Sequence, residues 1–199
     1  MSPLLHDLRR IATDMNQSGF GWCLVGGLAA SVYAEPRTTK DVDVAVSVSG
    51  EGDLLQLLEF LKARGYSKPQ VLMHVSPTRR MGWRVLLPAS SAGNFTPLDL
   101  LSSACGIEVE IVSRSKKIEL LPGLTLPVAS LGDLIAMKIL SQNSADRIQD
   151  RADVLALLRS ASPDDRQVAQ DALTHIAQSG LAAGRDLASD FAELLALGR

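Results

Sequence analysis

The sequence predicts a mixed α/β (α+β) domain over residues 1–127, with a mixed β-sheet flanked by helices, followed by a C-terminal helical region over residues 128–199. Three observations support this prediction. Helical and extended segments alternate before residue 65, short extended segments separated by Pro, Gly and Ser fill residues 70–121, and helical periodicity dominates after Pro127. With 199 residues, of which 46% are hydrophobic and 21% charged, the chain is long enough to bury a good-sized core.

The first part of the chain alternates between helices and strands. Apolar residues recur at helical spacing in three segments, and Gly19, Pro36 and Gly65 follow the ends of these segments. We expect, in chain order, a helix over residues 4–15, a strand over 22–25, a helix over 26–34, a strand over 41–48 and a helix over 54–61.

The second part changes from strands to helices near residue 128. Strands are expected over residues 71–75, 83–87, 95–101, 107–112 and 118–121. Ser130 and Asp133 form a capping-box signature for a helix over residues 131–140. Further helices are expected from about residue 146, over 164–178 and over 184–197.

Composition and charge narrow the classes of function. A net charge of −2 argues against a broad nucleic-acid-binding face, so any RNA contact is expected to be local. The two cysteines, Cys23 and Cys105, and three scattered histidines give no spacing typical of a zinc site. The sequence shows neither a signal-peptide core nor an apolar run of membrane-spanning length, so we expect a cytoplasmic protein with no membrane partner.

The segment Asp41–Val46, DVDVAV, is the most informative part of the sequence. Strand side chains alternate between faces, so the three valines form an apolar face while Asp41 and Asp43 point together from the other. Two carboxylates about 7 Å apart along a strand repel each other unless a cation lies between them. The segment therefore predicts a divalent-metal site. The alternative, an exposed edge strand with solvated acids, has to explain the valine face and the neighbouring Gly-Gly turn.

The Gly26-Gly27 pair follows an apolar strand and opens a helix. Glycines at such a turn let backbone N–H groups approach a phosphate, and the N-terminus of a helix favours negative charge. A Gly-Gly pair alone is a weak signal, because tight turns use it widely. Followed by one helix and then by the Asp41/Asp43 strand, it predicts a phosphate cradle beside a metal site.

These two segments resemble a known signature. Residues 24–30, LVGGLAA, and residues 37–43, RTTKDVD, resemble the polymerase-β-type nucleotidyltransferase superfamily, and more narrowly the AbiEii-like toxins of type IV toxin–antitoxin systems. That superfamily has a third carboxylate on a later strand, and Asp99, between leucines in residues 96–101, fits this position. Glu108 and Glu110 are the rival candidates, although the alternation IEVEI over residues 107–111 favours a solvated strand face for both.

The downstream half also resembles the toxin-like group. Residues 127–138, PVASLGDLIAMK, are similar to its pVaspedLiamK pattern, and Lys138 falls on an apolar helical stripe, where a lysine either extends to solvent or meets an anion such as a triphosphate. Residues 147–153, RIQDRAD, resemble the group's Arg-x-Lys-Asp-x-x-Asp element, with Gln149 in place of the lysine. Asp150 and Asp153 lie one helical turn apart and could equally pair with Arg147 or Arg151.

The resemblance implies an Mg²⁺-dependent transfer of a nucleoside monophosphate from an NTP to an acceptor hydroxyl. Two Mg²⁺ ions, or Mn²⁺ in their place, would be held by Asp41, Asp43 and Asp99. The predicted nucleotide-binding residues are Gly26, Gly27, Arg37, Thr39 and Lys138. The implied acceptor is RNA such as a tRNA 3′ end, a small-molecule alcohol or a protein, and the toxin-like relatives imply a cognate antitoxin.

Two other functions are compatible with parts of the pattern. A catalytically degenerate protein of the same fold would bind nucleotide or serve as an interaction module, and the change to Gln149 keeps this alternative open. Asp-x-Asp also occurs in glycosyltransferases, where it holds Mn²⁺ on a nucleotide-sugar. That motif requires neither a Gly-Gly turn upstream nor a third acid downstream, so the glycosyltransferase alternative explains less of the sequence.

Overall fold

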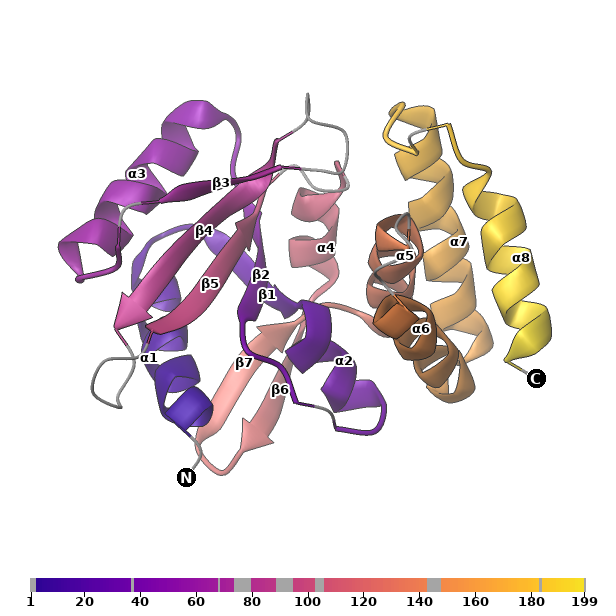
Figure 1. The fold of residues 1–199 in the computed structure, drawn as a ribbon, viewed down its shortest axis with the longest axis horizontal. Helices are drawn as coiled ribbons and strands as arrows, with labels where there is room; N and C mark the ends of the chain where they lie inside the picture. Colours follow the sequence, from indigo (N-terminus) through magenta and orange to yellow (C-terminus); the bar gives the residue numbers. More distant parts are fainter. Residues whose placement is uncertain are drawn as a thin grey trace.

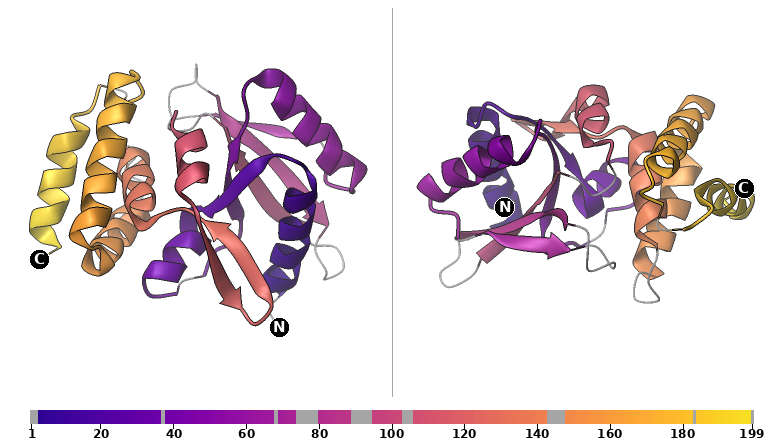
Figure 2. Two further views of the ribbon diagram at one scale, coloured as in Figure 1. Left: turned by 180° about the vertical axis from the view of Figure 1, so that it is seen from behind. Right: turned by 90° about the horizontal axis from the view of Figure 1, so that it is seen from above.

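In the computed structural model, a seven-stranded sheet lies beside a cluster of C-terminal helices (Figure 1). The structure describes residues 3–36, 38–67, 69–73, 80–88, 95–102, 106–142, 148–182 and 184–198. Helices α1, α3 and α4 cover the same face of the sheet, as the view from behind and the view from above both show (Figure 2). Helix α2 lies between the sheet and the C-terminal helices α5 to α8.

The helices and strands follow one another in an irregular alternation. In chain order they are α1 (Pro3–Gln17), β1 (Gly21–Val25), α2 (Gly26–Tyr33), β2 (Val42–Ser47), α3 (Glu51–Ala63), β3 (Gln70–Met73), β4 (Arg80–Pro88), β5 (Phe95–Leu101), α4 (Glu108–Arg114), β6 (Lys116–Leu121), β7 (Leu124–Val128), α5 (Leu131–Ser141), α6 (Ile148–Ser160), α7 (Pro163–Gln178) and α8 (Leu187–Leu197).

The sheet is mixed, with strand order β3-β4-β5-β2-β1-β7-β6. Strand β2 is central: it pairs antiparallel with β1 and parallel with β5. Strand β5 pairs antiparallel with β4 on its other side. The central strands are apolar runs, and Val42, Val44 and Val46 of β2 are fully buried, as expected for strands covered by other elements. An acidic side chain in these strands is therefore an exception that needs a partner.

Most of the predicted elements are present, with one clear error. Residues 107–112 were expected to form a strand, but Glu108–Arg114 is helix α4. Over five residues the pattern IEVEI fits both periods, and the helix satisfies it by burying Ile107 and Ile111, which are four positions apart. The expected solvated face is also wrong for Glu108, which is only 4% exposed.

A second difference concerns the end of the sheet. Strand β7 (Leu124–Val128) is absent from the sequence prediction, in which helices follow Pro127 directly. It pairs antiparallel with β6, and Gly123, with φ of 73°, lies in the turn between them. Val128 lies opposite Leu24 of β1, and the N–H of Ala129 donates to the carbonyl of Leu24. A domain boundary between residues 127 and 128, which stays a prediction, would therefore fall inside β7, before its last residue.

The C-terminal helices form a layered cluster around α5. Ser130 caps α5 by accepting a hydrogen bond from the N–H of Asp133, as the capping signature predicts. Gly132 lets α5 and α7 approach closely, because a Cβ there would overlap the carbonyl of Asp165 and the side chain of Val168. In the described parts of the chain, no helix combines the length and the apolar character that crossing a membrane requires.

Candidate active site

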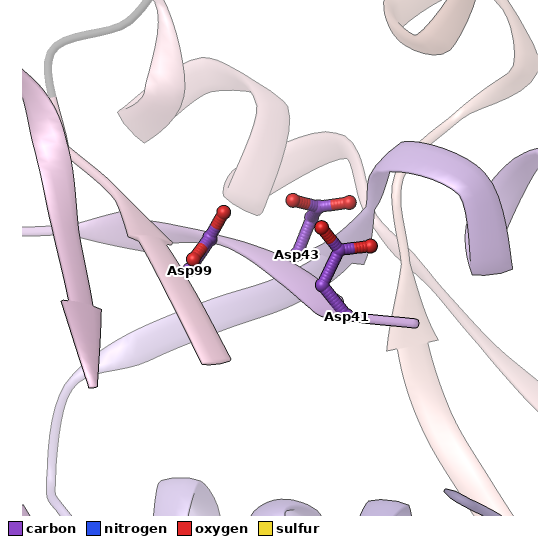
Figure 3. A group of neighbouring side chains, drawn as sticks. All are labelled: Asp41, Asp43 and Asp99. Carbon is purple, nitrogen blue, oxygen red and sulfur yellow. The ribbon is translucent and has the colours of Figure 1, made fainter. Parts of the chain in front are cut away.

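Three carboxylates converge on the sheet, those of Asp41, Asp43 and Asp99. Asp43 belongs to β2, Asp99 to β5, and Asp41 directly precedes β2. One carboxylate oxygen from each residue lies within 4.8 Å of those of the other two (Figure 3). The candidate residues that the sequence analysis grouped as metal ligands are thus neighbours in space, while their role as ligands stays a prediction.

The pairing of the strands explains this convergence. Asp43 and Asp99 are direct partners in the parallel β2–β5 ladder, so their side chains emerge side by side on the same face. Asp41 lies two residues before Asp43, which places its side chain on that face by strand alternation. The rival candidates, Glu108 and Glu110, lie on α4 and do not join the cluster of Asp41, Asp43 and Asp99.

The Gly26-Gly27 turn supports Asp43 directly. Gly26 has φ of 65°, a left-handed conformation that favours glycine, and a Cβ at this position would overlap the Asp43 carboxylate. The backbone N–H of Gly27, in the first turn of α2, donates a hydrogen bond to Asp43. The turn therefore places the N-terminus of α2 against the Asp43 carboxylate. A helix N-terminus stabilises a negative charge of this kind.

The electrostatic environment of Asp43 is unfavourable for a negative charge. Burial, the largest cause, acts together with the nearby carboxylates of Asp41 and Asp99 to raise the pKa of the Asp43 carboxyl from 3.8 to about 7. Lys138 and the N–H of Gly27 act in the opposite direction. A cation bound among the three acids would therefore stabilise the ionised form of Asp43. Carboxylate oxygens are the ligands that Mg²⁺ and Mn²⁺ prefer, so the donor set fits a divalent metal.

Arg84 is a residue of this site that the sequence analysis missed. It lies on β4 directly opposite Asp99. Its Nε donates to Oδ1 of Asp99 at 2.6 Å and its Nη2 to Oδ2 at 2.7 Å, a two-point ion pair. The same Nη2 lies 3.5 Å from Oδ2 of Asp41. An arginine inside the apolar segment Trp83–Leu87 was the available signal, but its partner could be recognised only from the register of β4 and β5.

The residues predicted to contact nucleotide fall into two groups. The hydroxyl of Thr39 donates to Oδ1 of Asp41 at 2.8 Å, so Thr39 holds an acid of the cluster in place. Arg37 lies outside the described residues. Gly26 and Gly27 lie against Asp43, as described above. Their contact with phosphate, and that of Thr39, stays a prediction.

Lys138 is buried and has two protein anions as partners. It is 8% exposed, and its Nζ lies 2.7 Å from Oδ1 of Asp150 and 2.8 Å from Oδ2 of Asp153. The hydroxyl of Ser141 also donates to Asp150, at 2.9 Å. The anions expected beside Lys138 are therefore supplied by α6. Arg151, one of the partners considered for Asp150 and Asp153, instead pairs with Glu193 at 2.9 Å, and Arg147 lies outside the described residues.

Solved structures with a similar fold include nucleotidyltransferase-like proteins. An antigenic nucleotidyltransferase-like protein from Paracoccidioides brasiliensis is 18% identical, with a TM-score of 0.56, over 92% of this chain and 89% of that chain. The protein JHP933 from Helicobacter pylori is 16% identical, with a TM-score of 0.51, over 98% of this chain and 90% of that chain. At these identities the likeness concerns the fold alone. No match is found among curated proteins.

The family comparison covers most of the sequence. Residues 16–196 match the family described as "Nucleotidyl transferase AbiEii toxin, Type IV TA system". The match includes the Gly-Gly turn, the cluster of Asp41, Asp43 and Asp99, and helices α5 to α7. The glycosyltransferase alternative explains neither this match nor the fold. The chain belongs to the AbiEii family of nucleotidyltransferases.

Proposed function

We propose that the protein transfers a nucleoside monophosphate from an NTP, ATP among them, to an acceptor hydroxyl, and that Asp41, Asp43 and Asp99 hold the two Mg²⁺ ions that the reaction needs. Mn²⁺ is the alternative ion. The observation that supports this most directly is the approach of the three carboxylates to within 4.8 Å of one another in a chain of a nucleotidyltransferase family. The bound ions would neutralise the triphosphate and the charge that develops during transfer.

The residues of the chain have distinct proposed tasks. Asp99 accepts the proton of the acceptor hydroxyl as the new bond to the α-phosphorus forms. The bond between the α-phosphorus and the bridging oxygen breaks, and pyrophosphate leaves. Gly26 and Gly27 lie at the N-terminus of α2, where backbone N–H groups favour the terminal phosphates. Thr39 keeps Asp41 in position through its 2.8 Å hydrogen bond.

Two basic residues are proposed to act on the leaving group. Arg37 and Lys138 would neutralise the negative charge that develops on pyrophosphate. Lys138 already contacts Asp150 and Asp153, so in this proposal its charge acts across the site while these carboxylates fix its position. The charge of Lys138 lowers the pKa of Asp43, which supports an electrostatic effect of Lys138 on the three acids at its present position.

The acceptor is proposed to be RNA such as a tRNA 3′ end, a small-molecule alcohol or a protein. The family description supports a role as the toxin of a toxin–antitoxin pair, with a cognate antitoxin as partner. A net charge of −2 is consistent with an RNA contact confined to the neighbourhood of the active site. The reaction belongs in the cytoplasm, where NTPs and RNA are available.

Pyrophosphate release tests this proposal. The protein is incubated with each NTP, Mg²⁺ and a mixture of purified RNA and small alcohols, and pyrophosphate is measured by a coupled assay. We expect release with at least one NTP, complete loss with EDTA, and loss in the Asp41→Asn variant. Release that persists in EDTA would contradict the proposed role of the metal. Binding of NTP without release of pyrophosphate in the presence of any of these acceptors would favour the degenerate binding module.

A further inference from the structure

Arg84 contacts two of the three acids that would share a metal ion. Its guanidinium group contacts both oxygens of Asp99 and lies within 3.5 Å of one oxygen of Asp41. The side chain comes from β4 and is on the same face of the sheet, because Arg84 is the direct ladder partner of Asp99. One positive group thus already contacts two of the three acids.

The guanidinium and a divalent ion compete for these acids. A cation bound by Asp99 and Asp41 would lie next to the Arg84 charge, and like charges at such short range repel. The two-point contact also uses both oxygens of Asp99 in directions fixed by the planar fork of the guanidinium. Metal binding to Asp99 is therefore favourable only if Arg84 moves or finds another anion.

Arg84 is placed to move, and its acid partner distinguishes it from a comparable arginine elsewhere in the chain. The Arg84 side chain is 35% exposed, so it can turn toward solvent or a ligand without breaking a packed core. Arg114, whose side chain is 40% exposed, makes a similar two-point contact to Asp133, at 2.7 and 3.2 Å, so exposure alone does not distinguish the two arginines. Asp133, however, is fully buried and is also bonded by Ser130 at the start of α5, which makes the Arg114 pair part of the fold.

We propose that Arg84 is a displaceable counter-ion: it holds Asp41 and Asp99 together before the nucleotide binds, and transfers its contacts to the triphosphate when the nucleotide enters with its metal. This inference rests on the proposed metal-dependent function. It makes metal binding and nucleotide binding cooperative, because the triphosphate gives Arg84 a new partner as the metal takes over the carboxylates. The metal alone is then a weak ligand, and the nucleotide–metal complex a strong one.

Mn²⁺ binding in the absence of nucleotide tests the inference without relying on activity. Free Mn²⁺ is measured by electron paramagnetic resonance during titration of wild type, Arg84→Gln and Arg114→Gln. We expect Arg84→Gln to bind Mn²⁺ about tenfold more tightly than wild type, within the range of coupling between binding sites. Arg114→Gln, the matched control, is expected to keep the wild-type affinity for Mn²⁺.

Nucleotide binding provides the second half of the test. With Mn²⁺ and the non-hydrolysable analogue α,β-methylene-ATP, Arg84→Gln is expected to bind the analogue about tenfold more weakly than wild type, because the triphosphate loses its partner. Arg84→Lys keeps the charge without the fork, and both of its affinities are expected to lie between those of wild type and Arg84→Gln. Thermal unfolding of each variant with and without Mn²⁺ verifies that it is folded, and Mn²⁺ is expected to stabilise Arg84→Gln more than wild type.

Two results would overturn the inference, and only the second of them would also contradict the proposed function. If Arg84→Gln binds Mn²⁺ no more tightly than wild type while wild type binds it measurably, Arg84 is only a positioning residue for Asp99, and the proposed function survives. If neither protein binds Mn²⁺, with or without the analogue, the metal site of the proposed function is wrong and the inference falls with it.

Discussion

Replacing Asp43 by asparagine is expected to lower nucleotidyl transfer by about three orders of magnitude, the scale expected when a group that stabilises transition-state charge is lost. Asp43 shares the cluster with Asp41 and Asp99 and accepts a hydrogen bond from the N–H of Gly27, so we expect neither neighbouring acid to replace it. The measurement is kcat/KM for pyrophosphate release in the presence of Mg²⁺.

A matched control separates this effect from a general loss of acidic charge. Asp53→Asn removes a carboxylate from the first turn of α3, where it accepts the N–H of Ser49 beyond the opposite end of β2. This variant is expected to keep wild-type activity. If Asp43→Asn kept more than a tenth of the wild-type rate, the assignment of Asp43 as a metal ligand would be wrong.

The same substitution is expected to stabilise the metal-free protein at high pH. In the folded state the pKa of Asp43 is about 7, above its ordinary value of 3.8, so between these two pH values the folded chain holds a proton that the unfolded chain has lost. The free energy of unfolding of wild type therefore falls as the pH rises through this window. Asparagine resembles the protonated form and lacks this decline.

Thermal unfolding in EDTA measures the difference. At pH 8 we expect Asp43→Asn to be more stable than wild type by on the order of 1–2 kcal/mol, which corresponds to roughly 2–8 °C in Tm for a chain of this size. At pH 4 the two proteins are expected to unfold at nearly the same temperature. A wild type that gains stability over Asp43→Asn as the pH rises would contradict the sign of the pKa shift.

Replacing Gly26 by alanine is the second change with a large expected effect. The left-handed backbone at Gly26 costs a residue with a Cβ about 1–2 kcal/mol, and the new Cβ would overlap the Asp43 carboxylate. The Asp43 side chain or the turn must therefore shift, which changes the position of Asp43 relative to Asp41 and Asp99. Because displacements of about 1 Å at a reacting centre cost on the order of 100-fold in rate, we expect a loss of activity of about that size in the pyrophosphate assay.

Gly180→Ala is the control for the backbone effect. Gly180 has a similar left-handed φ of 72°, but a Cβ there would meet no atom within 4 Å. We expect Gly180→Ala to lose stability comparable to Gly26→Ala from backbone strain while keeping its activity. Equal activity in the two variants would show that the contact between Gly26 and Asp43 has no part in the reaction.

The central strands could be predicted because local pattern and tertiary structure agree there. The valine face of β2 is buried as the alternation required, and the Gly-Gly pair begins α2. Asp99 could be chosen over Glu108 because an acid between leucines in a buried strand needs a partner. The parallel pairing that brings Asp99 beside Asp43, however, is a property of the sheet and not of either segment alone.

The parts that could not be predicted depend on contacts between distant segments. The pair of Arg84 and Asp99 is set by the register of β4 against β5, and nothing local in residues 83–87 indicates it. Residues 107–111 alternate too briefly to distinguish a strand from a helix, and packing of Ile107 and Ile111 decides for the helix. The partners of Lys138 come from α6. The position of Lys138 on the apolar face of α5 therefore predicts contact with an anion or with solvent, but not which anion.

The most direct test of the proposed reaction follows the phosphorus atoms of the nucleotide. Each NTP, labelled with ³²P at either the α or the γ position, is incubated with Mg²⁺, total RNA, cell protein and small alcohols, beside an Asp41→Ala/Asp43→Ala double variant. We expect α-label but no γ-label to enter one acceptor fraction with wild type, and no label with the double variant. Transfer of γ-label, or equal α-label with the double variant, would contradict metal-dependent nucleotidyl transfer at these three acids.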